Sequence, residues 1–283
     1  RAQIKQSGVE LIGADGPKAD VEIAQTAIAS LEAAGLSDFK LELGHAGIFG
    51  ALTAEINFND EDAELVRTLI DEKNYPALAQ ALCAYESSHR GECEALCKLP
   101  RLFGGAEVFT EADAVIKNGA AAEQVSYLKL VYERLAELGL DDRIVLDLGL
   151  VNRMEYYTGV IIGAYAAGSG ERVLSGGRYG ALYKKYGMNL SATGFAVNMD
   201  AVCDALERTS GVENPAPPEV LIYYGDGYGA DAYGAAAELR KAGVCAEMSD
   251  ADGFEQALLC ARAKGVKKLL RFDGTSPREI CLA

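Results

Sequence analysis

Three short segments combine polar or aromatic side chains with glycine in a way that could bind a small ligand. The first is the run Gln-Ser-Gly-Val-Glu at 6–10. In an extended backbone, side chains alternate between faces, so Gln6, Gly8 and Glu10 would share one face. A glutamine and a carboxylate on one face can bind an ammonium group or an imidazole N–H. A strand with a solvated face fits the same alternation, and this segment alone leaves both interpretations open.

The other two segments lie in the second half of the chain. The run Tyr156-Tyr157-Thr158-Gly159 leads into a predicted strand and could place one phenol in a pocket and the other in the core. The run Ser-Gly-Gly-Arg-Tyr-Gly at 175–180 has two glycines that allow a ligand to approach the backbone closely. Its Arg178 could bind a carboxylate through paired N–H groups. Ordinary strand aromatics, and a hairpin turn followed by a helix, are the alternatives.

One group of residues has a spacing that a metal site could use. His89, Cys93 and Cys97 would share one face of a helix, and Cys83 lies one and a half turns earlier. Zinc sites more often use pairs of ligands two to four residues apart on turns, and no second pair follows here. We therefore predict no metal site and no cofactor.

Composition and charge narrow the function classes. The chain has 283 residues, with 27 basic and 42 acidic residues and a net charge of −15. That balance argues against binding to nucleic acid, because phosphate contacts need clustered lysine and arginine. Seven cysteines, an odd number, favour reduced thiols in the cytoplasm over a disulfide framework. We find no apolar stretch long enough for a membrane span and no signal peptide. The chain starts without methionine, so we expect the true start to precede Arg1.

The pattern along residues 1–211 predicts an α+β domain. Apolar spacing indicates a helix over 20–34 and a strand over 39–43, and nearly everything from about 60 to 138 is helical. Short β-branched or aromatic runs at 144–148, 158–165 and 172–174, separated by glycines, are typical of an antiparallel meander. We therefore expect an antiparallel sheet with helices and a helical insertion at about 60–138.

A proline-rich linker at 212–218 separates this part from a second predicted domain at 219–283. The linker has three prolines within four residues, which cannot continue a helix or a central strand. After it, strands are predicted at 220–224, 244–248 and 268–272, alternating with helices at about 230–242 and 253–264. Such alternation indicates parallel βαβ units in a small α/β domain of three layers.

Taken in order, these segments resemble the catalytic domain of histidyl-tRNA synthetases. The resemblance rests on Gln-x-Gly-Val-Glu at 6–10, Leu-Val-x-x-x-Glu-Tyr-Tyr-Thr-Gly at 150–159, Gly-Gly-Arg-Tyr at 176–179 and Gly-Phe-Ala-Val-Asn-Met-Asp at 194–200. It implies the class II aminoacyl-tRNA synthetase fold, an anticodon-binding-like domain at 219–283 and a homodimer through the synthetase-like domain. It also implies that the chain begins within the second class motif, so we expect the segment with the first motif to be absent.

The sequence departs from the synthetases at two positions that matter for catalysis. Asn152 and Ala201 stand where the family has arginines, and Gly180 stands where aspartate normally follows Gly-Gly-Arg-Tyr. Amino-acid activation builds negative charge on the α-phosphate of ATP, and fixed arginines stabilise that charge. Because the loss of a transition-state cation costs orders of magnitude in rate, we expect no catalytic activity.

A synthetase-like domain that keeps its amino-acid pocket but lacks these arginines resembles the regulatory subunits of ATP phosphoribosyltransferase. That resemblance implies a hetero-oligomer with the short catalytic subunit, support of its activity, and feedback inhibition by histidine in the first step of histidine biosynthesis. A divergent histidyl-tRNA synthetase and a degenerate synthetase domain that contacts tRNA remain as alternatives. The resemblance implies six histidine-binding residues: Gln6, Glu10, Tyr156, Tyr157, Arg178 and Tyr179.

Overall fold

The computed structural model describes residues 3–117, 119–151, 157–184, 186–210, 216–274 and 276–282. The chain divides into two compact units, residues 1–212 and 213–283. Each unit has its own buried core. No described helix is long and apolar enough to cross a membrane.

A seven-stranded sheet forms the centre of the N-terminal unit. Its strands are β1 Gln6–Ile12, β2 Phe39–His45, β3 Phe103–Gly104, β4 Ile144–Asp147, β5 Val160–Ala166, β6 Leu174–Arg178 and β7 Ala192–Asn198. The strand order is β1-β7-β6-β5-β2-β4-β3. Within the described residues, neighbouring strands are antiparallel except β2 and β4, which are parallel. The predicted antiparallel sheet with helices is confirmed.

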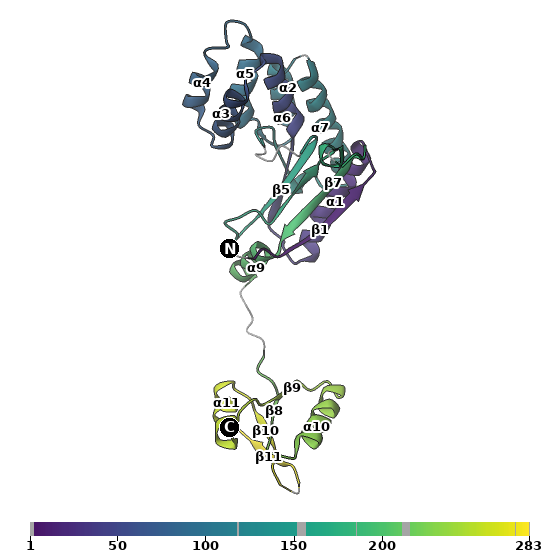
Figure 1. Ribbon diagram of the computed structural model, residues 1–283, viewed down its shortest axis with the longest axis vertical. Helices are drawn as coiled ribbons and strands as arrows, with labels where there is room; N and C mark the ends of the chain where they lie inside the picture. The colour runs from purple at the N-terminus through teal and green to yellow at the C-terminus, as the bar shows by residue number, and fades with distance from the viewer. Residues whose placement is uncertain are drawn as a thin grey trace. The chain divides into compact units, whose positions relative to one another are not determined.

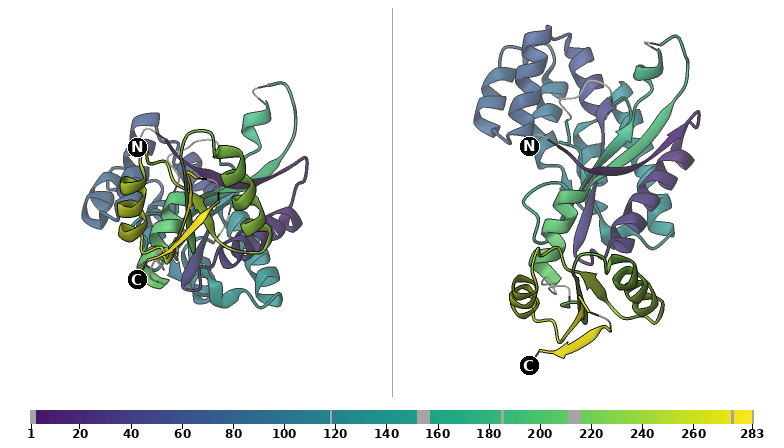
Figure 2. Two further views of the ribbon diagram at one scale, coloured as in Figure 1. Left: turned by 90° about the horizontal axis from the view of Figure 1, so that it is seen from below. Right: turned by 60° about the horizontal axis from the view of Figure 1, so that its bottom comes forward.

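Two long helices cover one face of this sheet. Helix α1 (Pro17–Ala33) packs against β6 and β7, and α7 (Gly119–Glu137) packs against β2 and against α1 (Figure 2). Helices α2 to α6 gather beside the sheet, where α2 packs against α7 (Figure 1). Their bounds are α2 Ala46–Ile56, α3 Asp60–Asp71, α4 Tyr75–Leu82, α5 Arg90–Lys98 and α6 Glu107–Val115, with 3₁₀ turns η1 Leu99–Arg101 and η2 Asp141–Arg143. Helices α8 Ala181–Lys184 and α9 Met199–Ser210 follow β6 and β7.

Local sequence signals explain where these helices begin and end. Helix α1 starts with Pro17, whose missing N–H is no loss in the first helical turn. It ends just before Gly35, whose φ of 95° is the left-handed conformation that glycine adopts without strain. The Asn59 side chain accepts a hydrogen bond of 2.8 Å from the Asp62 N–H and so caps α3.

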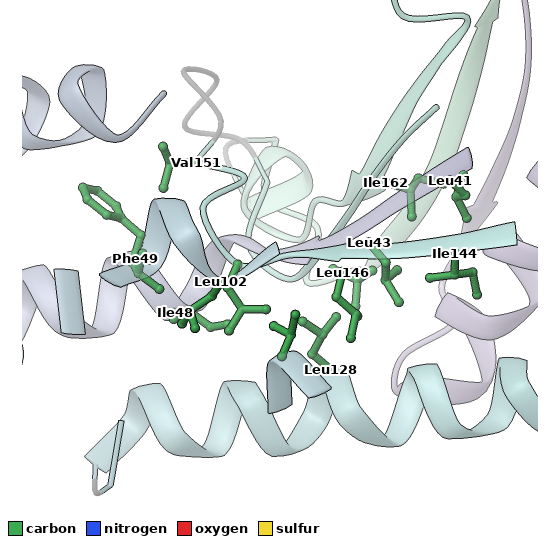
Figure 3. Close-up of a cluster of buried hydrophobic side chains, with 14 of the residues drawn as sticks. Leu41, Leu43, Ile48, Phe49, Leu102, Leu128, Ile144, Leu146, Val151 and Ile162 are labelled. Atoms are coloured by element: carbon green, nitrogen blue, oxygen red, sulfur yellow. The ribbon is translucent and has the colours of Figure 1, made fainter. Parts of the chain in front are cut away.

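The main core lies between the sheet and α7. Leu41 and Leu43 of β2 and Leu146 of β4 are fully buried, as is Leu128 of α7. Figure 3 shows Leu43 and Leu146 pointing from the sheet toward the helix that carries Leu128. Burial of each such leucine side chain contributes about 2 kcal/mol to folding. This packing covers one face of the sheet with helices.

The predicted meander is wrong at its first strand. Strands β5, β6 and β7 do follow one another in antiparallel order, but β4 is separated from β5 by β2 and runs parallel to β2. The runs at 144–148 and 158–165 overlap β4 and β5, whereas the run at 172–174 reaches only the first residue of β6. None of these runs could indicate which strands would be neighbours. The Gly-Gly-Arg run also lies within strand β6 and is not a hairpin turn.

The C-terminal unit is a four-stranded sheet between two helices. Its elements are β8 Val220–Tyr224, α10 Gly229–Lys241, β9 Ala246–Met248, α11 Phe254–Ala263, β10 Lys268–Phe272 and β11 Arg278–Cys281. Strand β8 is parallel to β9 and β10, while β11, which the sequence analysis did not predict, is antiparallel to β10. Ile222 packs with α10 residues and Leu221 with an α11 residue, so the two helices cover opposite faces.

Candidate functional site

A cavity of about 580 Å³ opens on the sheet of the N-terminal unit. Strands β1, β5, β6 and β7, together with α8, contribute to its walls. Six side chains give it polar character: Gln6, Glu10, Tyr157, Arg172, Ser175 and Tyr179. The structure therefore brings together four of the six residues predicted to bind histidine, although up to 173 positions separate them along the chain.

Small residues are frequent on the sheet face that carries this cavity. In register across β1, β7, β6 and β5, one row is Glu10, Gly194, Gly177 and Ile161, and the next is Gly8, Ala196, Ser175 and Gly163. Four of these eight positions are glycine. Since glycine, alanine and serine fill little space above the backbone, this part of the sheet leaves room for a ligand.

Two of the glycines determine where cavity side chains can lie. A Cβ atom at Gly194 would overlap the Glu10 carboxylate and the Val9 carbonyl oxygen. A Cβ atom at Gly177 would lie 2.6 Å from the Val160 carbonyl oxygen and 2.8 Å from the ring of Tyr157. The Glu10 carboxylate and the Tyr157 ring thus lie directly on glycine backbone.

The Glu10 carboxylate is also held from above. The Tyr179 hydroxyl donates a hydrogen bond to Oε2 of Glu10. The Tyr179 ring in turn stacks on Tyr183 of α8, with ring centroids 6.3 Å apart and planes 18° apart. A carboxylate fixed in this way can accept hydrogen bonds from a cationic group or an imidazole N–H.

Arg172 lines the cavity and was missed by the sequence analysis. Its Nη2 donates to Oε2 of Glu42 over 3.2 Å, and its Nε donates to the Tyr165 hydroxyl over 2.9 Å. Burial raises the pKa of Glu42, and the positive charge of Arg172 partly opposes that rise. The sequence signal for this residue was a positively charged side chain just before the apolar pair Val173 and Leu174. That signal did not indicate on which face of the sheet the side chain would lie.

Arg178, predicted to bind histidine, does not line the cavity. Successive side chains of β6 alternate between faces, and its guanidinium group meets α1. Only 7% of Arg178 is exposed. Its Nε donates to Oδ1 of Asp20 over 3.0 Å, its Nη2 lies 2.9 Å from the same oxygen, and its Nη1 donates to the Asp15 carboxylate over 3.1 Å. Arg178 therefore ties α1 to the sheet.

The ion pair continues into a buried network. Asp20 is 1% exposed and accepts a second hydrogen bond, of 2.7 Å, from the Tyr127 hydroxyl of α7. The His45 ring packs edge-on against Tyr127 with centroids 5.7 Å apart, and its Nδ1 accepts the Gly47 N–H at the start of α2. Burial lowers the pKa of His45 to about 4, and the charge of Arg178 contributes to that shift.

The lowered pKa predicts that acid destabilises the fold through His45. Unfolded chains take up a proton near the ordinary pKa of 6.5, while the folded protein resists protonation down to about 4. The contribution of neutral His45 to the free energy of unfolding is therefore fully present above pH 6.5 and is lost as the pH falls toward 4. Between pH 7 and pH 5 we expect a loss of about 2 kcal/mol from this group.

Urea unfolding of wild type and of His45→Asn at both pH values measures this effect. Asparagine can still accept the Gly47 N–H but does not titrate, so the variant should lose less stability on acidification. The only other histidine, His89, is present in both proteins and provides an internal reference. Equal acid sensitivity of the two proteins would contradict the assignment to His45.

Several further predicted positions can be placed. Tyr156 and Asn152 lie outside the described residues. Ala201 lies in the first turn of α9 with 1% exposure and brings no charge there. Cys83 is exposed, Cys93 is buried and Cys97 is intermediate. In the described ranges, no group of three or more histidine, cysteine, aspartate or glutamate side chains is arranged to hold a metal ion.

This chain is similar in sequence to proteins of known families. The family profile described as histidyl-tRNA synthetase matches residues 1–202. The ATP phosphoribosyltransferase regulatory subunit of Clostridium kluyveri is 37% identical over 269 residues, which cover 95% of this chain and 69% of the relative. The chain belongs to the family of ATP phosphoribosyltransferase regulatory subunits.

Two further proteins with the same family name are similar to this chain in sequence or in structure. The regulatory subunit of Clostridium botulinum strain Langeland is 37% identical over 97% of this chain, which spans 65% of that relative's length. The crystal structure of an ATP phosphoribosyltransferase regulatory subunit/histidyl-tRNA synthetase from Bacillus halodurans superposes with a TM-score of 0.78 at 29% identity, over 96% of this chain and 69% of that one.

A more distant structure shows the shared fold. Histidyl-tRNA synthetase from Nostoc superposes with a TM-score of 0.70 at 16% identity, over 98% of this chain and 72% of that chain. The predicted class II synthetase fold is confirmed by these comparisons.

Proposed function

We propose that the protein is a non-catalytic regulatory subunit that binds histidine in the cavity on the β1–β7–β6–β5 sheet. It assembles with the short catalytic subunit of ATP phosphoribosyltransferase, is required for that subunit's activity, and transmits feedback inhibition by histidine. The names of the family members support the partnership. We also propose that the protein is located in the cytoplasm and forms a homodimer through the N-terminal unit.

The observation that carries the proposal is the fixed carboxylate of Glu10 among aromatic side chains. Glu10 receives the Tyr179 hydroxyl, and the Tyr157 ring lies on the same cavity face above Gly177. An imidazole ring offers both an N–H donor for a carboxylate and a flat apolar surface for a phenol. Histidine therefore matches the chemistry of this part of the cavity.

Two sequence positions argue against catalysis by the chain itself. Asn152 and Ala201 carry no charge where related synthetases have arginines that stabilise ATP phosphates. Without those cations, amino-acid activation would lose orders of magnitude in rate. A domain that binds the amino acid without activating it can serve as a sensor.

Histidine can regulate a partner only through a difference in affinity. If it binds one arrangement of the assembly more tightly than another, it shifts the population toward the first, and the shift is limited by the ratio of the two affinities. A ratio of about 100, or roughly 2.7 kcal/mol, suffices for strong feedback inhibition.

Co-purification with a short catalytic subunit, followed by an assay with and without histidine, tests the proposal. We expect a hetero-oligomer whose phosphoribosyltransferase turnover exceeds that of the catalytic subunit alone and falls when histidine is added. A divergent histidyl-tRNA synthetase is the second candidate, because the synthetase profile matches residues 1–202. Histidine-dependent pyrophosphate exchange by the purified protein would favour this candidate.

Changes at two cavity residues should weaken histidine binding while leaving assembly intact. Glu10→Gln removes the negative charge that accepts an imidazole N–H, and Tyr157→Phe removes a hydroxyl. We expect the Kd for histidine to rise about 10- to 100-fold for Glu10→Gln and less for Tyr157→Phe. Isothermal titration calorimetry measures the affinity, and gel filtration with the catalytic subunit measures assembly.

Glu22→Gln is the matched control for Glu10→Gln. Glu22 is an exposed carboxylate on α1 and does not line the cavity. Its replacement should leave the histidine affinity unchanged. If Glu10→Gln bound histidine as tightly as Glu22→Gln does, histidine would have to bind elsewhere, for instance at a subunit interface.

A further inference from the structure

Arg172 is the charged cavity residue that neither the sequence resemblance nor the relatives' names account for. Of the charged side chains that line the cavity, Glu10 is negative and Arg172 is positive. They lie at different places on this sheet face, since the Glu10 carboxylate rests over Gly194 of β7 and the Arg172 guanidinium over Gly163 of β5. A ligand in this cavity thus meets an anion at one end and a cation at the other.

The guanidinium group is positioned by three neighbours. A Cβ atom at Gly163 would lie 3.4 Å from Nε and 3.6 Å from Cζ of Arg172, so the group rests on the backbone of β5. Tyr165 accepts from Nε at 2.9 Å and Glu42 accepts from Nη2 at 3.2 Å. A guanidinium has five N–H donors, so these two bonds leave donors that can reach a ligand.

The strand register gives the separation of the two glycines on which the charged groups rest. Gly194 on β7 pairs with Gly177 of β6, and Gly163 on β5 pairs with Ser175 of β6. The two glycines are therefore two strands apart, and two residues apart along the strand direction. With strands about 4.8 Å apart and a rise of about 3.4 Å per residue, the two sites are about 12 Å apart. A hydrogen bond of about 2.9 Å at each end leaves about 6 Å for the ligand itself.

We propose that Arg172 binds the α-carboxylate of the amino acid in the cavity and so makes the site selective for a free amino acid over its decarboxylated amine. The inference rests on the proposed histidine site. The α-ammonium and α-carboxylate share one carbon atom and cannot span 6 Å between them. A ligand that reaches both charges therefore directs its side chain toward Glu10 and its carboxylate toward Arg172.

Binding of histidine and of histamine to the wild-type protein, measured by isothermal titration calorimetry, tests the selectivity without any variant. Histamine keeps the imidazole and the amine but lacks the carboxylate. We expect histamine to bind about 10- to 100-fold more weakly than histidine, the usual effect of losing a charge-assisted hydrogen bond. Equal affinities would overturn the role of Arg172 while leaving the proposed histidine site in place.

The variant Arg172→Gln then assigns the selectivity to this residue. Its histidine affinity should fall about 10- to 100-fold, while its histamine affinity should stay within a factor of about two of wild type. Arg172→Lys keeps the charge without the planar fork and should fall between the two. Arg101→Gln is the control, because Arg101 packs on the Tyr75 ring outside this cavity.

The outcomes separate this inference from the proposed function. A wild-type protein that binds histidine, with an Arg172→Gln variant that still prefers histidine over histamine, overturns the inference alone. A wild-type protein that binds neither compound overturns the proposed histidine site and with it the inference. Loss of histamine binding in a folded Arg172→Gln variant would show that Arg172 shapes the cavity and does not recognise the carboxylate.

Discussion

Replacing Arg178 with methionine is expected to lower the free energy of unfolding by about 3–5 kcal/mol, because the change leaves a buried carboxylate without its cation. Asp20 is 1% exposed and would keep only the Tyr127 hydroxyl as a described side-chain partner. Such a loss is a large fraction of the 5–15 kcal/mol typical of folded proteins. Urea unfolding followed by far-UV circular dichroism measures it.

A surface arginine provides the control for this variant. Arg208 of α9 is exposed and donates to the Gly168 carbonyl oxygen over 3.0 Å, so Arg208→Met should cost less than about 1 kcal/mol. The double variant Asp20→Asn/Arg178→Met should recover part of the stability, because asparagine removes the unpaired charge. An Arg178→Met protein as stable as Arg208→Met would contradict the role of the buried pair.

Secondary structure was predictable from the sequence where local chemistry decides it. The ends of α1, α10 and α11 follow from periodic apolar residues that stop before Gly35, Gly243 and Gly265, each with positive φ. The apolar runs predicted as strands in both units each overlap an observed strand. These features depend on residues close in sequence, so one sequence contains the information.

Strand pairing was less predictable because it depends on contacts between distant segments. Strand β2 lies between β4 and β5, although β2 precedes both of them by about a hundred residues along the chain. Edge strand β11 is short and carries charged residues, so it has little apolar pattern to reveal it. The hydrophobic alternation of a strand is the same whichever neighbour it pairs with.

The candidate site illustrates the same limit at the level of single residues. The motif resemblance picked out Gln6, Glu10, Tyr157 and Tyr179, which all line one cavity. It also selected Arg178, whose neighbour Tyr179 faces the cavity while Arg178 itself is buried against α1. In a strand, a shift of one residue changes the face, so membership of a motif does not determine which side chain meets the ligand.

Replacing Gly177 with alanine is expected both to destabilise the N-terminal unit and to abolish measurable histidine binding. Its φ of 156° lies in the region that favours glycine, and an added Cβ would lie 2.6 Å from the Val160 carbonyl oxygen. Backbone strain and crowding together should cost about 2–4 kcal/mol. The Tyr157 ring, 2.8 Å from the added atom, would have to move away from the β6 backbone.

The control for this variant is Gly170→Ala, where an added Cβ would have no heavy atom within 4 Å. It should unfold within about 0.5 kcal/mol of wild type and bind histidine normally. Unfolding in urea and titration with histidine on the same preparations separate the two effects. A Gly177→Ala protein that is destabilised yet binds histidine as wild type does would mean that Tyr157 contributes nothing to the ligand. A protein unchanged in both respects would mean that the β6 backbone adjusts freely, and the close approach of strand and phenol would not be what shapes this cavity.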